Sequence, residues 1–119
     1  MDKEMEKVVT EFMDAWSNND WYEMLIRTQK TWQSKSSSDA KMIFDLFGGQ
    51  KIESYEIGMG REISSMCYDI IVTINKEKRT VARVIKERSP YTPSVEGEWG
   101  INPISMLNPL PFIYEQGIE

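Results

Sequence analysis

The sequence contains no histidine and a single cysteine, Cys67. Without histidine, a Cys–His nucleophile is excluded, and so is a histidine general base. One cysteine cannot form a disulfide within the chain, and its place inside a strand pattern favours a buried or half-buried side chain over a reactive thiol. Because an unpaired cysteine is typical of proteins in a reducing compartment, we expect a cytoplasmic location.

Long apolar runs and basic patches are also missing. The longest apolar stretch is Ile70-Ile71-Val72, and residues 1–7 are charged and lack the apolar core of a signal peptide. The 14 Lys and Arg residues are scattered among 19 Asp and Glu residues, which gives a net charge of −5. We therefore expect no membrane segment and no nucleic-acid partner.

Loops that bind phosphate or calcium are not recognisable either. Gly48-Gly49 follows a predicted helix, whereas a phosphate-binding loop precedes one. Gly58-Met59-Gly60 is too short for a nucleotide-binding fingerprint, and we interpret it as a turn. The sequence predicts no metal site and no cofactor, since neither histidine nor a carboxylate loop supplies the ligands.

Apolar spacing predicts three helices in the first half of the chain. Met5, Val8, Val9, Phe12 and Trp16 form one stripe, which indicates an amphipathic helix that Asp2 caps. The second helix opens at residue 20 with a capping box and extends through residue 32. The third begins near residue 38 and ends at residues 48–49, where a left-handed glycine is expected.

After residue 49 the apolar period changes from 3.6 to 2, which indicates strands. Strands are predicted at residues 52–57, 63–75, 80–88 and 99–106, with a hairpin turn at residues 75–78 and a loop at residues 89–94. Pro103 interrupts the last strand, because proline lacks the amide donor that a sheet needs.

Helices grouped before strands predict an α+β fold, with three N-terminal helices packed on a curved antiparallel sheet of about four strands. At 119 residues the chain has room for one domain. We assign residues 1–108 to this domain and residues 109–119 to a C-terminal tail.

Three stretches of the chain resemble the NTF2-like superfamily, the cystatin-like cone shared by SnoaL-like and ketosteroid-isomerase-like proteins. They are residues 8–21, residues 47–57 and residues 98–103, and together they span most of residues 5–106. The resemblance is closest to small, uncharacterised members. It implies an NTF2-like cone with a conical pocket and a homodimer formed through the outer face of the sheet. It implies no particular reaction, because this fold carries enzymes as well as binding domains.

The sequence departs from the catalytic members of that superfamily. No residue matches their histidine base, and no motif places an acid, a tyrosine and a protonated aspartate in one pocket. Asp69 and Tyr68 are the remaining candidates for an acid–base pair. The face with Tyr68, Ile70 and Val72 is the more apolar one, so the alternation favours burial of that face. Asp69 is then solvated or paired with a residue such as Arg83 on the other face.

Several aromatic residues could line a pocket for a flat apolar ligand, although core packing is the more common role of such residues. The pocket candidates are Tyr22, Trp32, Tyr55, Tyr68 and Trp99.

No catalytic constellation is visible, and we therefore favour a non-catalytic domain that binds a small apolar ligand or a protein partner. The alternative is a small cofactor-independent enzyme of the isomerase or dehydratase type that uses a pocket Asp and Tyr. The two hypotheses differ in whether a carboxylate and a phenol converge inside the fold.

Overall fold

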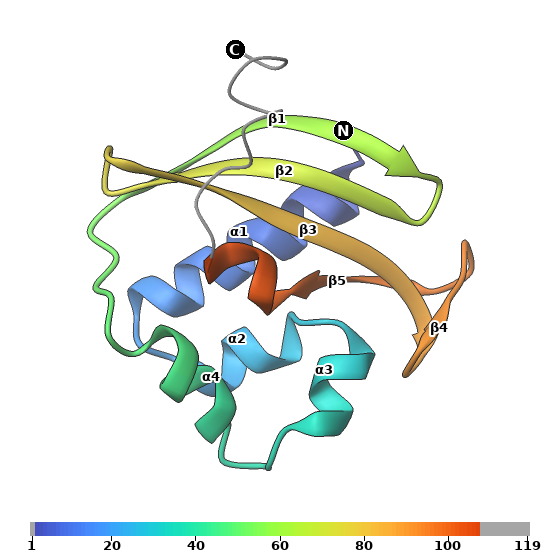
Figure 1. The fold of residues 1–119 in the computed structure, drawn as a ribbon, viewed down its shortest axis with the longest axis horizontal. Coiled ribbons are helices and arrows are strands. Elements are labelled where there is room, and N and C mark those ends of the chain that lie inside the picture. The colour runs from blue at the N-terminus through green and yellow to red at the C-terminus, as the bar shows by residue number, and fades with distance from the viewer. Residues whose placement is uncertain (1, 108–119) are drawn as a thin grey trace.

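The computed structural model describes residues 2–107, which form helices followed by an antiparallel sheet (Figure 1). The helices are α1 (Lys3–Ser17), α2 (Trp21–Ile26), α3 (Lys30–Lys35) and α4 (Lys41–Phe47). The strands are β1 (Tyr55–Ser64), β2 (Cys67–Ile74), β3 (Lys78–Ser89), β4 (Thr92–Pro93) and β5 (Glu98–Asn102), and a 3-10 helix, η1 (Pro103–Leu107), follows. The predicted α+β class is confirmed, whereas the tail predicted at residues 109–119 lies outside the described residues.

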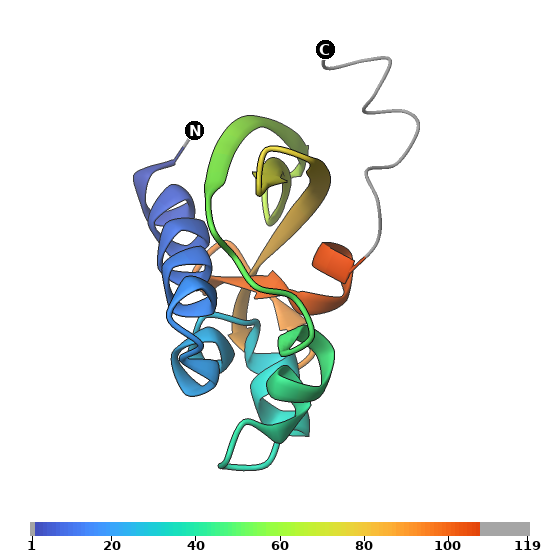
Figure 2. The same ribbon diagram turned by 90° about the vertical axis from the view of Figure 1, so that its left-hand side faces the viewer.

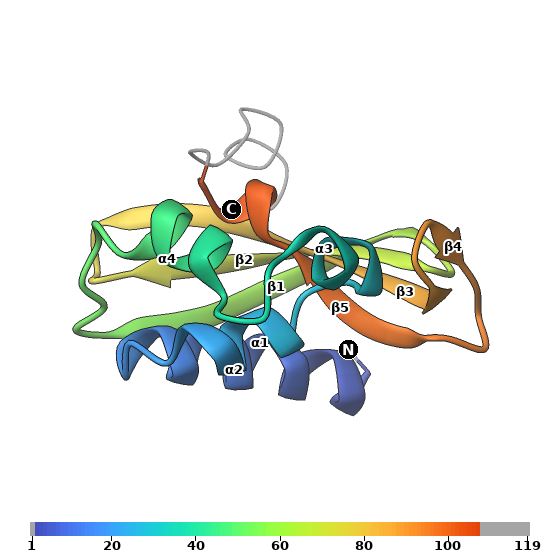
Figure 3. The same ribbon diagram turned by 90° about the horizontal axis from the view of Figure 1, so that it is seen from below.

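The sheet has the order β1-β2-β3, with β5 and the short β4 both paired to the far side of β3. All these pairs are antiparallel, and the sheet is not strongly curled. Figure 2 shows α1 along one side of the sheet, and Figure 3 shows that α1 runs along its length. In Figure 1 the helices α2, α3 and α4 lie below the strands, and α4 packs beside α2.

Helix α1 forms as its apolar stripe predicts. Asp2 accepts a hydrogen bond from the Glu4 backbone N–H and caps the helix, and Asn18 ends it. Met5, Val9 and Phe12 are fully buried on the face that meets the sheet. The stripe therefore places the opposite, polar face of the helix toward solvent.

The core fills the space between α1, α4 and the sheet. Phe12, Trp16 and Phe47 pack edge to face, with ring centroids 4.7–6.3 Å apart. From the sheet, Ile70, Val72 and Ile74 of β2 contribute fully buried side chains. The predicted inward face of this strand is confirmed, and it packs against the aromatic cluster.

Residues 2–107 contain four α-helices instead of the predicted three, because the second predicted helix is interrupted. Thr28 forms an isolated parallel bridge with Ile101, and Gln29 donates its backbone N–H to the Ile101 carbonyl at 3.0 Å. These contacts to β5 divide the segment into α2 and α3. The expected left-handed glycine at residues 48–49 is also wrong, because Gly48 has a right-handed φ of −66°.

The strand boundaries near the predicted glycine turn are corrected as well. β1 continues through Gly58 and Gly60, with a register shift between Ile57 and Gly60 that accommodates an extra residue. The turn lies between Ser64 and Cys67, so the strand predicted at residues 63–75 is two strands. β5 ends at Asn102, because Pro103 opens η1 and stops the ladder.

The predicted hairpin turn after β2 is confirmed. Asn75 and Lys76 both have positive φ angles, 54° and 61°, as a type I′ turn requires. The Asn75 Oδ1 accepts the backbone N–H groups of Glu53 and Ser54, and its Nδ2 donates to the Lys51 carbonyl. The turn thereby fixes the segment that leads into β1.

Candidate functional site

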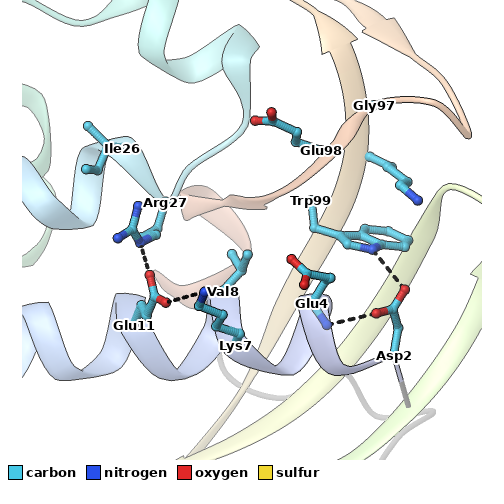
Figure 4. Close-up of a pocket in the computed structure, with 11 residues that line it drawn as sticks. Asp2, Glu4, Lys7, Val8, Glu11, Ile26, Arg27, Gly97, Glu98 and Trp99 are labelled. Carbon is cyan, nitrogen blue, oxygen red and sulfur yellow. Dashed lines mark hydrogen bonds and ion pairs between the residues drawn. The ribbon is translucent and has the colours of Figure 1, made fainter.

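The main cavity of the described residues is an open groove of about 370 Å³ between α1 and the end of the sheet (Figure 4). One wall is the N-terminal half of α1, and the other is formed by the end of α2 with β3 and β5. The lining residues are Asp2, Glu4, Lys7, Val8, Glu11, Ile26, Arg27, Lys86, Gly97, Glu98 and Trp99. Its volume lies in the range of roughly 300–1,000 Å³ that small-molecule sites have.

Charged groups of both signs surround an apolar strip in this groove. At one end Arg27 Nε lies 2.5 Å from Glu11 Oε2, at an angle that makes the contact an ion pair without an aligned hydrogen bond. Glu11 also lies 3.8 Å from Lys7 Nζ. Val8 lies between these ions and Trp99, and Ile26 adds apolar surface beyond Arg27 (Figure 4). A ligand here would meet an apolar wall together with ionic partners of either sign.

Trp99 is the principal aromatic residue of the groove. Its indole Nε1 donates to Asp2 Oδ2 at 3.4 Å, and Lys86 Nζ lies 5.3 Å from the ring centroid. The Glu4 backbone N–H holds the pKa of the Asp2 carboxyl below its usual value, and the indole adds to this effect. The half-buried ring is thus oriented from both walls, which positions it to stack on a flat ligand.

Of the five predicted pocket residues, the structure brings two together. Tyr68 packs against Trp99 edge to face, with centroids 6.1 Å apart, at the helix-facing side of the sheet. Tyr22 on α2 is 56% exposed and lies outside the groove lining. Trp32 on α3 contacts Lys35, whereas Tyr55 on β1 donates a hydrogen bond to Asp14.

The two candidates for acid–base chemistry do not meet. Asp69 and Tyr68 are consecutive on β2 and therefore lie on opposite faces of the sheet. Asp69 faces away from the core and accepts two hydrogen bonds from Arg83, at 2.7 and 2.9 Å. The pairing with Arg83 that the alternation suggested is present, and Asp69 lies outside the groove lining.

Glu87 is a buried carboxylate that the sequence did not reveal. The charged run at residues 86–88 is typical of a solvated strand, yet Glu87 is only 2% exposed. It accepts the backbone N–H of Thr31 at 3.0 Å and the Thr31 hydroxyl, and that hydroxyl in turn accepts the Tyr91 backbone N–H. The prediction of solvation is wrong, because α3 covers this end of β3 and needs an acceptor there.

We expect the replacement of Glu87 to lower the free energy of unfolding. Glu87→Ala leaves the buried Thr31 N–H and hydroxyl without their acceptor, and we expect a loss of about 2–3 kcal/mol in the free energy of unfolding. Glu87→Gln keeps one of the two oxygen acceptors and places an amide N–H at the other position, so it should cost about 1 kcal/mol, less than Glu87→Ala. Urea unfolding followed by circular dichroism measures both. Equal losses for the two variants would show that the hydrogen bonds to Thr31 are not what Glu87 contributes.

We expect the ionisation of the Tyr55 phenol to lower the stability of the protein in alkaline solution. Burial raises the pKa of the Tyr55 phenol to about 12, and the hydrogen bond to Asp14 adds to it. The phenol ionises near pH 10 in the unfolded chain. Its stabilising contribution is therefore complete below about pH 10 and is lost as the pH rises to about 12.

Urea midpoints between pH 9 and 12 test this dependence. The natural chain should lose stability more steeply than Tyr55→Phe, which has no phenol to ionise at that position. The comparison removes the contribution of the other tyrosines, since both proteins contain them. Parallel pH profiles for the two proteins would contradict the role given to Tyr55.

Three further features of the described residues concern metal ligands, membrane-spanning helices and the thiol of Cys67. Among residues 2–107 there is no group of three or more Cys, Asp or Glu side chains arranged to hold a metal ion. No helix in this part of the chain is long and apolar enough to cross a membrane. Cys67 is half-buried, and burial raises the pKa of its thiol, which disfavours the reactive thiolate at neutral pH.

The groove was not predictable residue by residue. Its lining comes from the polar face of α1, the last residue of α2 and two strands distant in sequence, and only Trp99 had been a candidate. Charged residues on an exposed helix face carry no local signal of a cavity.

No protein-family model, curated protein or solved structure matches the chain.

Proposed function

We propose that this chain is an NTF2-like domain that binds a small ligand without catalysis, in the groove beside Trp99. The observation that carries the proposal is the groove itself, where a half-buried indole and apolar side chains adjoin ionic groups of both signs. The space between the helices and the sheet holds packed side chains such as Phe12, Trp16 and Val72, which are at most 1% exposed. A ligand is therefore expected at the open end of this space.

The order of elements supports the family assignment. A long first helix along an antiparallel sheet, with shorter helices before the first strand, matches the arrangement that the resemblance implies. The groove would then be the open end of the cone. Tyr68 and Trp99, both from the resemblance-based pocket set, meet next to it.

The groove also suggests the chemical class of the ligand. Val8, Ile26 and the Trp99 ring offer an apolar surface, and Lys7, Lys86 and Glu4 lie around it. A small molecule with a flat apolar part and charged groups fits this lining better than the purely apolar ligand expected from the aromatic residues alone. An aromatic amine or an aromatic acid has this character.

The acid–base pair named for the enzyme alternative does not form, because Asp69 and Tyr68 lie on opposite sheet faces. The homodimer expected from the resemblance stays a prediction, which sedimentation equilibrium tests. A cytoplasmic location is likewise part of this proposal, and the single unpaired cysteine supports it.

Binding of small aromatic amines and acids, screened by ligand-observed NMR, tests the proposal. Trp99→Leu keeps an apolar side chain but removes the aromatic ring and its cation–π contact with Lys86. We expect this substitution to weaken ligand binding about tenfold. Lys51→Glu is the matched control, because Lys51 is exposed and lies outside the groove lining. Ligands that bind the natural chain and Trp99→Leu equally well would exclude the groove as their site.

A further inference from the structure

Trp32, one of the predicted pocket residues outside the groove, belongs to a pair of aromatic rings that flank a lysine. The Lys35 ammonium lies 4.7 Å from the centroid of the Trp32 ring and 5.4 Å from that of the Tyr91 ring. Both distances are within the roughly 6 Å over which a cation is attracted to an aromatic face. Among residues 2–107 no carboxylate forms an ion pair with this ammonium, so two rings from distant parts of the chain hold one cation.

Helix α3 supplies the first ring and the cation. Trp32 and Lys35 are three residues apart, which places them on the same face of the helix. α3 packs against β3, and Figure 1 shows it beside the end of this strand, where the chain turns toward β4. Tyr91, which supplies the second ring, lies in this turn.

Tyr91 is held in the turn by a buried network. Its backbone N–H donates to the Thr31 hydroxyl at 2.8 Å, and that hydroxyl donates to the buried Glu87 carboxylate. Tyr91 also has a φ angle of 61°, in the left-handed region that a residue with a side chain rarely adopts. Because Thr31 directly precedes Trp32, the network fixes the Tyr91 backbone next to the helix that carries the other ring. Backbone strain of this kind is common where a side chain is positioned for a ligand.

The spacing of the two rings suits a methylated ammonium group. A methyl carbon packs about 3.5–4 Å from ring carbons, so the nitrogen that bears it lies roughly 4–5.5 Å from the ring. The nitrogen between Trp32 and Tyr91 lies at such distances from both centroids. The Lys35 side chain is exposed, and its strongly hydrated ammonium regains water when it leaves the rings. A quaternary ammonium ion is the ligand that such aromatic pairs recognise in proteins.

We propose that Trp32 and Tyr91 form a binding site for a trimethylammonium group, and that Lys35 occupies this site when no ligand is bound. The ligand then displaces the lysine into solvent. Free choline and a choline lipid headgroup both present this cation. The site is separate from the groove beside Trp99, whose lining includes neither of the two rings, so it does not rest on the function proposed for the groove.

Titration of choline into the isotope-labelled full chain tests the site by NMR. We expect saturable shifts of the Trp32 indole N–H signal, and about tenfold tighter binding by Lys35→Ala, because the internal competitor is removed. Lys51→Ala is the matched control, since Lys51 is also exposed, and it should bind choline as the natural chain does. The proposal is overturned if the two variants have equal affinities, or if choline shifts the Trp99 indole signal and leaves that of Trp32 unchanged.

A second variant examines the ring in the turn. Tyr91 is 67% exposed, so Tyr91→Leu should keep the fold and weaken choline binding about fivefold. Tyr22→Leu is the control, because Tyr22 is 56% exposed and belongs to α2. An unchanged affinity for Tyr91→Leu, with the circular dichroism spectrum retained, would mean that the two rings do not act as one site.

Vesicles distinguish the two sources of the trimethylammonium group. Sedimentation of the natural chain with phosphatidylcholine vesicles, but not with phosphatidylglycerol vesicles, would support the site and identify a lipid headgroup as its ligand. Binding of free choline without binding to either vesicle would support the site and identify a soluble ligand. Failure of Lys35→Ala to bind both choline and phosphatidylcholine vesicles would overturn the proposal.

Discussion

Gly100→Ala is expected to destabilise the protein by about 3 kcal/mol or more, a large part of the stability of a domain of this size. A Cβ atom at Gly100 would lie 2.6 Å from the backbone of Gln29 and 2.7 Å from the Thr28 carbonyl oxygen. These are backbone atoms, so the methyl group forces β5 away from the segment between α2 and α3. The hydrogen bonds that join Ile101 to Arg27 and Gln29, at 2.9 and 3.0 Å, would be lost or distorted.

Gly49→Ala is the matched control, because a Cβ atom there has no neighbour within 4 Å. Its φ angle is not positive either, so alanine is tolerated and the change should lie within about 0.5 kcal/mol of zero. Chemical denaturation of both variants gives the comparison. Similar free energies of unfolding for Gly100→Ala and Gly49→Ala would contradict the close approach of β5 to residues 28–29.

Trp16→Ala should cost about 3–5 kcal/mol in the free energy of unfolding, the range seen when a large buried aromatic is truncated. Trp16 is 1% exposed, and its ring centroid lies 4.7 Å from that of Phe47 and 6.3 Å from that of Phe12. Its indole Nε1 also donates to the Gln50 carbonyl at 3.2 Å. The substitution removes the centre of the aromatic cluster and leaves a cavity between α1 and α4.

Tyr22→Ala provides the comparison for Trp16→Ala. Tyr22 is also a large aromatic residue, on the next helix, α2, but its side chain is 56% exposed. Its truncation should therefore change the free energy of unfolding by less than about 1 kcal/mol. Thermal unfolding of the two variants, followed by circular dichroism, separates core from surface. A loss for Tyr22→Ala as large as that for Trp16→Ala would mean that the aromatic cluster is not the centre of the core.

The sequence predicted those elements that are determined by residues close together along the chain. The stripe from Met5 to Trp16 identified α1, because one apolar face requires no knowledge of its partner. The turn at Asn75 was equally visible, since its residues favour the backbone angles that a hairpin needs. The apolar alternation of β2 also identified which face would meet the helices.

Elements that depend on distant contacts were not predicted. The break between α2 and α3 exists because Ile101, more than seventy residues away along the chain, bonds to the backbone of residues 27 and 29. The path of β1 through Gly58 depends on a bulge opposite Ile71, and glycine alone favoured a turn. The burial of Glu87 likewise depends on α3, so its charged neighbours were a misleading guide.

In the candidate site, too, some residues could be named from the sequence, whereas others are brought there only by the tertiary fold. Trp99 was one of five aromatic residues named as pocket candidates, and it is the one of them that lines the groove. Lys7, Glu11 and Arg27 were not, since ion pairs on a helix face are common and only the tertiary fold places them opposite Trp99. The proposed ligand class is based on the groove lining, whereas the expectation of a non-catalytic domain was based on the lack of a recognisable catalytic constellation in the sequence.

The most direct test of the central proposal is the chemical-shift map of a bound ligand on the isotope-labelled full chain. Aromatic amines or acids that bind should shift the indole N–H signal of Trp99 together with the backbone signals of Val8 and Lys86, and leave the buried Trp16 indole unchanged. That pattern would place the ligand in the groove. Shifts centred on Trp16 and Phe47, with Trp99 unaffected, would place it inside the core and contradict the proposal.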